Sequence, residues 1–386
     1  MSEASHYVKG EASSEPPIRV TLDELRVHCA AILHQSGLAD AAAQLVADSL
    51  VDAEARGIAS HGVTRVRIYS QRLRAGLIDP TAEPEVIART PGRVRVDAHN
   101  AIGHLGAHVG LHAAIDQAKE HFVSVAGVAN SNHCGTLAYF TRQATEHGLI
   151  TIAMSTAPIT MIYFGGRSRA VGTNPLSIAV PRPGNPPVVV DMATSATARG
   201  KIILANRLGH DIPEGWAVDR DGHPTTDAAA ALEGSVVPFG GVKGSGLAMM
   251  VDLLAGAMVA GLTGSDIGDM YEDFGRTQRV SHLFIVLNPD GWVGSEAFGD
   301  HVLDFVERFQ ALPPAEGVQR LYLPGEPEQD RFDQARREGV LVERAVTADL
   351  NSLADEVGLS RHLTPLSSAD LFTSSTPRNQ PLTEKA

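Results

Sequence analysis

The sequence predicts an α/β protein in which a small helical bundle is joined to a unit built on a mixed sheet. Three amphipathic helical patterns with short links occupy residues 19–82, and strand patterns that alternate with helical patterns fill residues 83–311. We expect a further helical pattern near residues 346–357 to return to the bundle. The predicted domains are therefore residues 19–82 together with 312–360, and residues 83–311.

The composition narrows the class of protein. The 386 residues are 43% hydrophobic and 20% charged, which is typical of a soluble globular protein. The formal net charge of -13 argues against a nucleic-acid or anionic-membrane surface, because both are bound mainly through basic patches. We therefore expect a small-molecule partner, with no nucleic-acid and no membrane partner.

Cysteine usage and the chain ends bear on the compartment. Cys29 and Cys134 cannot form a disulfide framework, and neither belongs to a CxxC pair, as expected in a reducing compartment. Residues 1–18 are polar and acidic, without the charged-then-apolar pattern of a signal peptide, so we expect a cytoplasmic protein with a disordered N-terminus. Residues 361–386 are rich in Ser, Thr and Pro and are expected to be a disordered tail.

The first helix of the bundle has a capping box, in which Thr21 precedes Glu24, and its apolar stripe stops at Gly37. A second helix is expected to begin at an Asp40 cap and to run to about residue 55. Ser60 can cap a third helix that continues to about residue 74, with a glycine just beyond its end. Three helices with short links indicate a small orthogonal bundle.

The sheet unit begins with a hairpin signal, two short apolar stretches around a turn at residues 90–92. A strand over 122–128, a polar loop over 130–135, a helix over 136–147 and a strand over 149–154 have the spacing of a crossover unit. Such a unit places the loop at a carboxyl end of the sheet, where α/β proteins bind ligands. The other elements expected here are a helix over 105–121, strands over 177–180, 188–190 and 281–287, and a helix over 296–309.

The apolar run over residues 246–264 has nearly the length of a membrane span. Asp252 and the many Gly and Ala residues within it favour a helix that packs closely against its neighbours. We therefore expect this run to be a buried helix of the sheet unit.

The stretch from Ser60 to Arg65 is the first candidate site. It places the His61 imidazole near a predicted helix start and a guanidinium four residues later, and residues i and i+4 share one helix face. A small ligand could there meet both a proton donor and a carboxylate-binding group. These residue types outline a site for a small 2-oxo or 2-hydroxy acid.

Four other histidines are candidates for chemistry. His133 lies in the polar loop that follows a strand, which favours a role in ligand binding over a place in the core. Its neighbour Cys134 raises the alternative of a thiol nucleophile, but adjacent residues rarely point the right way for a Cys–His couple. His104, His108 and His112 recur at i, i+4 and i+8, and the outer two would lie roughly 12 Å apart on a helix. That is too far for one ion, so we interpret them as surface residues and predict no catalytic metal.

Neither common nucleotide motif is present, since both GxGxxG and the Walker pattern are missing. Residues 240–246 are glycine-rich and carry Lys243 at a helix start, so they could bind a phosphate or simply form a tight turn. Asp191 ends an apolar strand and could cap a helix or accept hydrogen bonds from ribose hydroxyls or a histidine. The residues leave these alternatives open.

A series of short motifs runs along the chain. In order they are Ser60-His61-Gly62 with Arg65 and Tyr69, Asn130-Ser131-Asn132-His133, Gly165-Gly166, Gly172-Thr173-Asn174-Pro175, Asp191-Met192-Ala193-Thr194, Gly200-Lys201, Pro213-Glu214-Gly215-Trp216-Ala217, Gly240-Gly241-Val242-Lys243-Gly244 and Pro324-Gly325-Glu326. From about residue 22 to residue 359 the chain thus resembles the type 2 malate/L-lactate dehydrogenases. This family includes ureidoglycolate, sulfolactate and diketogulonate dehydrogenases and piperideine-2-carboxylate reductase.

The resemblance implies a homodimeric, metal-free oxidoreductase that binds NAD or NADP on a non-classical nucleotide-binding fold, which would explain the missing GxGxxG. It implies that His61 donates a proton to the substrate carbonyl oxygen, although in some members the residue matching His133 is the acid/base. Arg65 and Thr173 would hold the substrate carboxylate, beside Ser60. The residues that the resemblance places along the cofactor are Thr156, Asp191, Met192, Ala193, Thr194, Lys243, Gly244, Pro324, Gly325 and Glu326.

The expected reaction transfers a hydride between nicotinamide and a small 2-oxo/2-hydroxy acid, with an imidazole as proton donor or acceptor. One alternative is a reductase of a cyclic imine carboxylate, and another is a non-catalytic binding protein on the same fold. A metal- or thiol-dependent hydrolase is more remote. Residues 158–164 depart from the family pattern, so the substrate stays open, as does the choice between NAD and NADP.

Overall fold

The computed structural model describes residues 16–366, with the side chains of residues 204, 207 and 208 left out. Most of the two segments expected to be disordered, residues 1–18 and 361–386, therefore lies outside the described residues. Ile18, at the end of the first segment, is instead the first residue of a strand, and Leu363, in the second, is buried.

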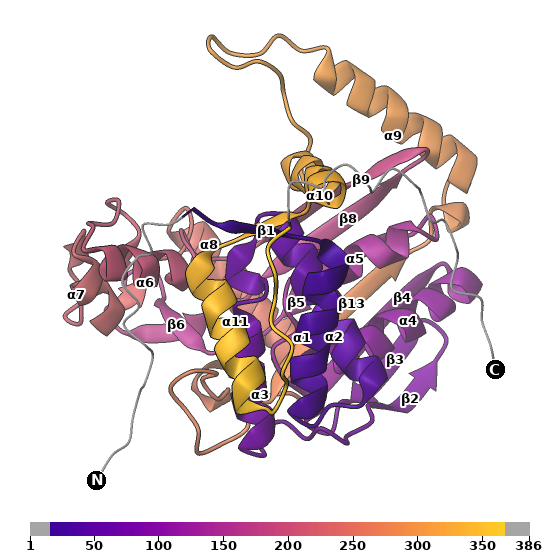
Figure 1. The fold of residues 1–386 in the computed structure, drawn as a ribbon. Helices are drawn as coiled ribbons and strands as arrows, with labels where there is room; N and C mark the ends of the chain where they lie inside the picture. The colour runs from indigo at the N-terminus through magenta and orange to yellow at the C-terminus, as the bar shows by residue number, and fades with distance from the viewer. Residues whose placement is uncertain (1–15, 367–386) are drawn as a thin grey trace.

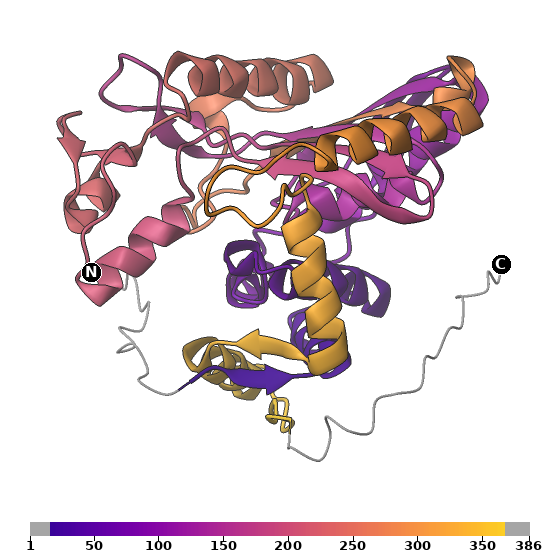
Figure 2. The same cartoon turned by 90° about the horizontal axis from the view of Figure 1, so that it is seen from above.

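Helices and a two-stranded ribbon from both ends of the chain form a helical unit. Its elements are β1 (Ile18–Val20), α1 (Leu22–Gln35), α2 (Asp40–Ala55), η1 (Ala59–His61), α3 (Arg65–Arg74), α10 (Glu326–Glu338), β14 (Val340–Val342) and α11 (Arg344–Glu356). β1 pairs with β14 antiparallel, and one hydrophobic cluster contains Leu25, Leu50, Val66 and Leu350. Seen from above, this unit forms a layer on one side of the sheet (Figure 2).

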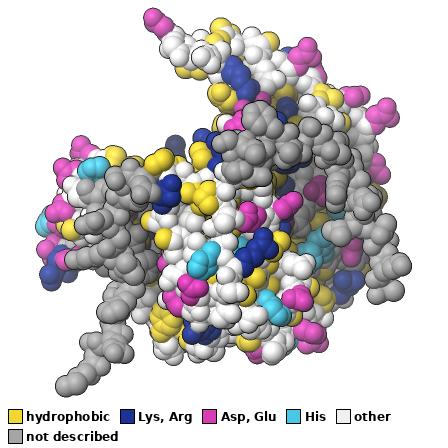
Figure 3. All heavy atoms as spheres, in the orientation of Figure 1, with side chains coloured by type: hydrophobic (Ala, Val, Ile, Leu, Met, Phe, Trp, Pro, Cys, Tyr) yellow, Lys and Arg dark blue, Asp and Glu magenta, His cyan; other side chains and the backbone are white. Residues whose placement is uncertain are grey.

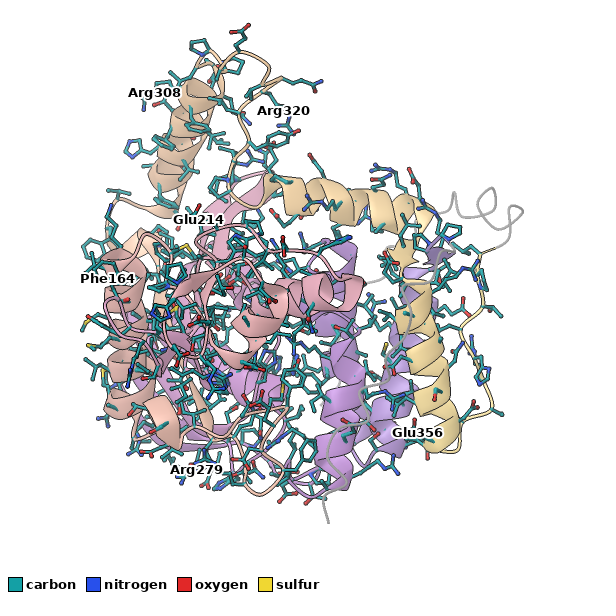
Figure 4. The ribbon with its side chains drawn as sticks, turned by 90° about the vertical axis from the view of Figure 1, so that its left-hand side faces the viewer. Phe164, Glu214, Arg279, Arg308, Arg320 and Glu356 are labelled. Atoms are coloured by element: carbon teal, nitrogen blue, oxygen red, sulfur yellow. The ribbon has the colours of Figure 1, made fainter. Side chains whose placement is uncertain are left out.

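The sheet unit contains seven strands in the order β2-β3-β4-β13-β5-β8-β9. Its elements are β2 (Glu85–Thr90), β3 (Arg93–Asp97), α4 (Gly103–His121), β4 (Val123–Ser131), α5 (Leu137–Thr145), β5 (Ile150–Ser155), β8 (Leu176–Arg182), β9 (Asn185–Met192), β13 (Val280–Leu287), η5 (Pro289–Gly291) and α9 (Ser295–Gln310). Alternate residues of β13 face opposite sides: Phe284 packs with α4 and α5, and Leu283 packs on the other face. α9 and the segment after it project from the body (Figure 1), and Arg308 and Arg320 mark that projection in Figure 4.

A smaller unit is built on five short strands in the order β11-β10-β12-β6-β7. Its elements are β6 (Ile159–Ile162), β7 (Arg169–Gly172), α6 (Arg199–Leu208), β10 (Ala217–Val218), β11 (Pro224–Thr225), α7 (Ala228–Glu233), β12 (Ser235–Val236), α8 (Val242–Val251), the π-helical turn η2 (Asp252–Gly256), η3 (Ala257–Val259) and η4 (Gly264–Asp266). This sheet is not predicted from the sequence, because its strands have only two to four residues, too few to show a period.

Several predicted elements are confirmed. Thr21 caps α1 by accepting a hydrogen bond from the Glu24 backbone N–H, and β2 and β3 form the expected antiparallel hairpin. The crossover from β4 through α5 to β5 is also present, since both strands run antiparallel to β13 and therefore parallel to each other. β13 lies between them, although it is more than a hundred residues away in sequence.

Other expectations were wrong. Asp40 is the first residue of α2 rather than its cap, and α3 begins at Arg65 rather than at Ser60. His61 thus lies in the 3₁₀ turn η1, because the backbone bends at Gly62 and the Val63 N–H is bound by a buried side chain of α2, Glu54. The interpretation of three surface histidines fails for His104, which is 0% exposed.

The run over 246–264 is not the single buried helix that was expected. Within residues 16–366 one helical run, Val242–Val259, is long and apolar enough to cross a membrane, which is weak evidence because core helices pass the same test. Val251, Ala255 and Val259 on it pack against the sheet. The opposite side of the run exposes large apolar side chains, namely Met249, Met250, Leu253, Leu254 and Met258.

On the face of the molecule shown in Figure 3, acidic and basic side chains are interspersed.

Candidate active site

Two imidazoles from different elements meet at the edge of the helical unit. His61 comes from η1 and His133 from the loop after β4, and their rings stack with centroids 5.5 Å apart and planes inclined by 25°. The His133 backbone N–H donates to Gln278 Oε1 at 3.2 Å, which fixes the loop. The structure thus brings together the two histidines that the sequence analysis proposed as rival acid/base residues.

The hydrogen bonds of His133 define which nitrogen carries its proton. Nδ1 lies 2.6 Å from the Tyr69 hydroxyl and 3.2 Å from the Gly135 backbone nitrogen. Because a backbone N–H can only donate, Nδ1 is an acceptor, and in the neutral ring the proton is on Nε2. His133 is therefore a general acid/base candidate oriented by a third group, Tyr69.

Both histidines are poor bases in this state. Burial, with the Arg65 cation, lowers the pKa of His61 to about 3. Burial lowers the pKa of His133 well below its ordinary value, with Arg65 and then His61 acting in the same direction. Both rings are therefore neutral at pH 7, and a negative charge beside Arg65 would raise both pKa values.

Arg65 is held between the histidines and a distant loop. Its Nε donates to the Ser60 carbonyl oxygen at 2.7 Å, and its guanidinium carbon lies 5.3 Å from the centre of the Tyr271 ring. The Ser60 hydroxyl oxygen lies 3.0 Å from His61 Nδ1. The start of α6 is also close, because a Cβ on Gly200 would lie 3.9 Å from that of Ser60. Ser60, His61 and Arg65 thus share one wall although they do not share a helix.

The proposed cofactor residues around β9 lie close to the start of α8. The Thr194 N–H donates to the Thr173 carbonyl at 3.1 Å, and the Phe239 N–H donates to the Thr194 carbonyl at 3.1 Å. A Cβ on Gly244 would lie 2.6 Å from the Thr194 carbonyl oxygen, so only glycine allows this approach. Thr173, Ala193 and Thr194 are therefore next to the glycine-rich helix start.

This helix start has features that fit an anionic group. α8 has ten residues, and the exposed Lys243 lies in its first turn. The Thr194 hydroxyl is buried and has no protein hydrogen-bond partner. The exposed Phe164, labelled in Figure 4, donates its backbone N–H to Ser245 Oγ at 2.8 Å. A free donor and a cation at a helix N-terminus suit the phosphates of a dinucleotide.

The remaining cofactor candidates have structural contacts of their own. Asp191 Oδ2 accepts from the Ala138 N–H at 2.8 Å, so the carboxylate caps α5, and burial raises its pKa to about 6. Thr156 is only 2% exposed, and its hydroxyl accepts from the Ser281 N–H. The Pro324 carbonyl accepts from the Val189 N–H at 3.0 Å, which places residues 324–326 beside β9. Met192, at the end of β9, is exposed.

Cys134 does not have the environment of a nucleophile. It is buried, its Sγ lies 3.8 Å from His282 Nδ1, and burial raises its pKa to about 12. Reactive cysteines have lowered pKa values, so a thiol mechanism is disfavoured. Among residues 16–366, no three His, Cys, Asp or Glu side chains converge so as to hold a metal ion.

Sequence reasoning missed several residues of this wall. Tyr69 entered only as part of a motif, and Tyr271, Gln278 and Glu54 were not considered. Tyr271 and Gln278 lie in a segment without periodicity about 200 residues beyond Arg65, so no local pattern could have linked them. Tyr69 lies four residues after Arg65, so helical spacing does predict it on the same face as Arg65.

The fold is α/β, and the two stacked imidazoles beside a guanidinium are the groups that an acid–base site for a small anion would need. Comparison with known proteins identifies the family. Residues 20–351 match the family model described as malate/L-lactate dehydrogenase, and the chain belongs to that family.

Individual relatives cover most of the chain. It is 36% identical over 308 residues to ureidoglycolate dehydrogenase (NAD(+)) of Escherichia coli, which is 80% of this chain and 88% of the relative. It is 36% identical over 339 residues to Delta(1)-pyrroline-2-carboxylate/Delta(1)-piperideine-2-carboxylate reductase of Pseudomonas aeruginosa, which is 88% of this chain and 100% of the relative. The solved structure of sulfolactate dehydrogenase from Methanocaldococcus jannaschii superposes with a TM-score of 0.82 at 32% identity, over 89% of this chain and 98% of that one. The mixed α/β fold is thus that of known dehydrogenases.

Proposed function

We propose that the chain is an NAD- or NADP-dependent oxidoreductase that interconverts a small 2-oxo acid and the corresponding 2-hydroxy acid. The observation that supports this most is the stacked pair His61–His133 beside Arg65. A carboxylate on the guanidinium would place the neighbouring carbon, the one that reacts, next to an imidazole. The nicotinamide cofactor, when bound, supplies or accepts the hydride.

The two histidines can supply or accept the proton that the reaction requires. Reduction of a ketone generates an alkoxide oxygen that must gain one proton, and oxidation of the alcohol must release one. Because two imidazolium ions would repel each other, we infer that at most one of His61 and His133 is in the charged imidazolium form at a time. The substrate carboxylate offsets the Arg65 charge, so substrate binding itself raises the pKa of the pair.

We assign the substrate and the cofactor to residues of the sequence motifs described above. Ser60, Arg65 and Thr173 hold the substrate. The cofactor residues are Thr156, Asp191, Met192, Ala193, Thr194, Lys243, Gly244, Pro324, Gly325 and Glu326. The unpartnered Thr194 hydroxyl and the exposed Lys243 at the start of α8 support the phosphate end of this assignment. We also infer that the sheet-containing residues 83–311 form the cofactor domain, of a non-classical type, and that residues 19–82 and 312–360 form a helical-bundle domain.

A second candidate is a reductase of a cyclic imine carboxylate, favoured by the name of the Pseudomonas relative. It needs the same carboxylate contact and the same proton, delivered to nitrogen instead of oxygen. The test is turnover against malate/oxaloacetate, lactate/pyruvate, ureidoglycolate, sulfolactate, diketogulonate and piperideine-2-carboxylate. The hydroxy acids are assayed with NAD+ and NADP+, and the oxo acids and the imine with NADH and NADPH. Failure of the folded protein to bind either cofactor would favour a non-catalytic binding protein instead.

We further propose a homodimer, in line with the family. The exposed apolar side of Val242–Val259, with Met250, Leu253 and Met258, supports an interface there, because contiguous exposed apolar side chains often mark a protein–protein contact. Light scattering after size exclusion tests this, and Leu253→Glu should shift the protein toward monomer. We propose a cytoplasmic location with no nucleic-acid or membrane partner, to be tested by cell fractionation.

A further inference from the structure

One face of α3 carries two residues of the candidate site and a buried arginine. Arg65, Tyr69 and Arg72 stand at i, i+4 and i+7, so their side chains leave the helix on the same side. Arg65 contacts Tyr271 and Tyr69 contacts His133, as described above. Arg72 is the one whose role is so far unassigned.

Arg72 is fully buried and holds a single loop. It is 0% exposed, and its guanidinium donates only to backbone carbonyls of residues 269–276, which we call the strap. Nη1 donates to the carbonyls of Asp273 at 2.9 Å and Met270 at 3.2 Å, and Nη2 donates to that of Arg276 at 3.0 Å. A fourth, longer contact joins Nη1 to the Asp269 carbonyl at 3.4 Å.

The planar fork of an arginine suits this arrangement. Several carbonyls that converge from one loop need several donors at fixed angles, which a lysine ammonium cannot supply in the same geometry. Burying a guanidinium is costly, and these charge-assisted bonds offset the cost only if the strap keeps its conformation. Arg72 and the strap conformation therefore depend on each other.

Two residues of the strap contact other parts of the molecule, one at Arg65 and one in the smaller unit. The Tyr271 ring lies against the Arg65 guanidinium, and the residue is 38% exposed, so it is also accessible to solvent. Glu272 forms ion pairs with Arg199 at 2.9 Å and with Arg169 at 3.8 Å, both in the smaller unit. The Asp269 carboxylate accepts the backbone N–H groups of Tyr271 and Glu272, which fixes the turn that presents them. The strap thus connects α3, the Arg65 guanidinium and the smaller unit.

We propose that Arg72 is a positioning residue, which holds the strap so that Tyr271 stacks on Arg65 and keeps its guanidinium oriented toward the substrate carboxylate. The inference rests on the proposed function, because it assigns the carboxylate to Arg65. It makes Tyr271 a residue that determines how tightly carboxylate substrates bind, with no part in proton transfer.

The test is a set of steady-state measurements on the best substrate of the acid panel. Arg72→Lys should raise KM for the acid roughly tenfold, the effect of losing a partly desolvated cation–π contact. Its kcat should change by less than about threefold, and KM for the cofactor should stay unchanged. Tyr271→Ala should show the same KM increase, and Tyr271→Phe, which keeps the ring, should behave as wild type. In the double variant the effect should not exceed that of Tyr271→Ala alone, because both changes act through one contact.

Arg74→Lys is the matched control. Arg74 is on the same helix, is half exposed and faces Glu356 at 4.0 Å, and its replacement should leave KM unchanged. Binding of oxamate, an unreactive analogue of a 2-oxo acid, should weaken in calorimetry in parallel with KM. If Arg72→Lys fails to fold, the KM for the acid in Tyr271→Ala compared with Tyr271→Phe still tests the inference, because Tyr271 lies at the surface and its replacement should not prevent folding.

Two outcomes would overturn the inference in different ways. If wild type turns over an acid but Arg72→Lys and Tyr271→Ala keep its KM for the acid, or if they lower kcat and raise the KM for the cofactor instead, then Arg72 has only a structural role. If wild type neither turns over any acid nor binds oxamate, the proposed function is wrong and the inference falls with it.

Discussion

The buried carboxyl of Glu54 gives a stability prediction whose magnitude can be worked out. Glu54 is on α2, 9% exposed, and its Oε2 accepts from the Val63 N–H at 3.0 Å, beneath the turn that carries His61. Burial raises its pKa from 4.5 to about 7, although the Val63 hydrogen bond opposes this. A glutamine can accept the same hydrogen bond without a charge, so Glu54→Gln isolates the cost of ionisation.

Proton binding by Glu54 determines whether stability rises or falls with pH. Between about pH 4.5 and pH 7 the folded protein holds a proton on Glu54 that the unfolded chain has lost, so stability falls as pH rises through this window. A shift of roughly 2.5 pKa units corresponds to about 3 kcal/mol of unfolding free energy. Glu54→Gln should therefore be more stable than wild type by up to about 3 kcal/mol at pH 8, and close to wild type below about pH 4.5.

Urea unfolding followed by circular dichroism at a series of pH values measures this difference. The exposed Glu83 provides the control, since Glu83→Gln should leave the pH dependence unchanged. A Glu54→Gln variant that is less stable than wild type at pH 8, or whose advantage does not grow between pH 5 and pH 8, would refute the reasoning. The first result would mean that the charge itself stabilises the turn at Val63.

Three further predictions concern the site. His61→Ala should abolish turnover and leave cofactor affinity nearly intact in a fluorescence titration, whereas a residual rate near wild type would move the acid role to His133. Oxamate binding at about pH 4, just above the pKa of His61, should take up protons, because its carboxylate offsets the Arg65 charge, which together with burial lowers both histidine pKa values. Calorimetry in buffers of different ionisation enthalpy measures this uptake, and proton release would contradict it. Iodoacetamide should leave activity unchanged at neutral pH, because burial raises the pKa of Cys134 to about 12, and inactivation in step with labelling of that thiol would revive a thiol mechanism.

Local chemistry made part of the fold predictable. The Thr21 cap, the turn at residues 90–92 and the crossover from β4 to β5 each depend on residues close in sequence, and each is present in the structure. The position of β13 between β4 and β5 depends on a pairing across more than a hundred residues, which no local pattern encodes. The same holds for the short strands of the smaller unit.

The candidate site shows the same division. The sequence identified His61, Arg65 and His133 by residue type, but it placed the first two on one helix face, and the structure separates them into η1 and α3. That error came from Glu54, whose bond to the Val63 N–H lies outside any motif. The stacking of the two imidazoles and the contact of Arg65 with Tyr271 are tertiary, so only the folded chain reveals them.

The central claim is that the wall formed by His61, His133 and Arg65 handles the carboxylate and the proton of a hydride-transfer reaction. Its most direct test is the absorbance of reduced nicotinamide in the panel of acids and the cyclic imine, with wild type and Arg65→Met compared for each cofactor. We expect turnover of at least one compound by wild type and a large increase in its KM in Arg65→Met. Binding of neither cofactor by folded wild type, or an unchanged KM in Arg65→Met, would contradict the account.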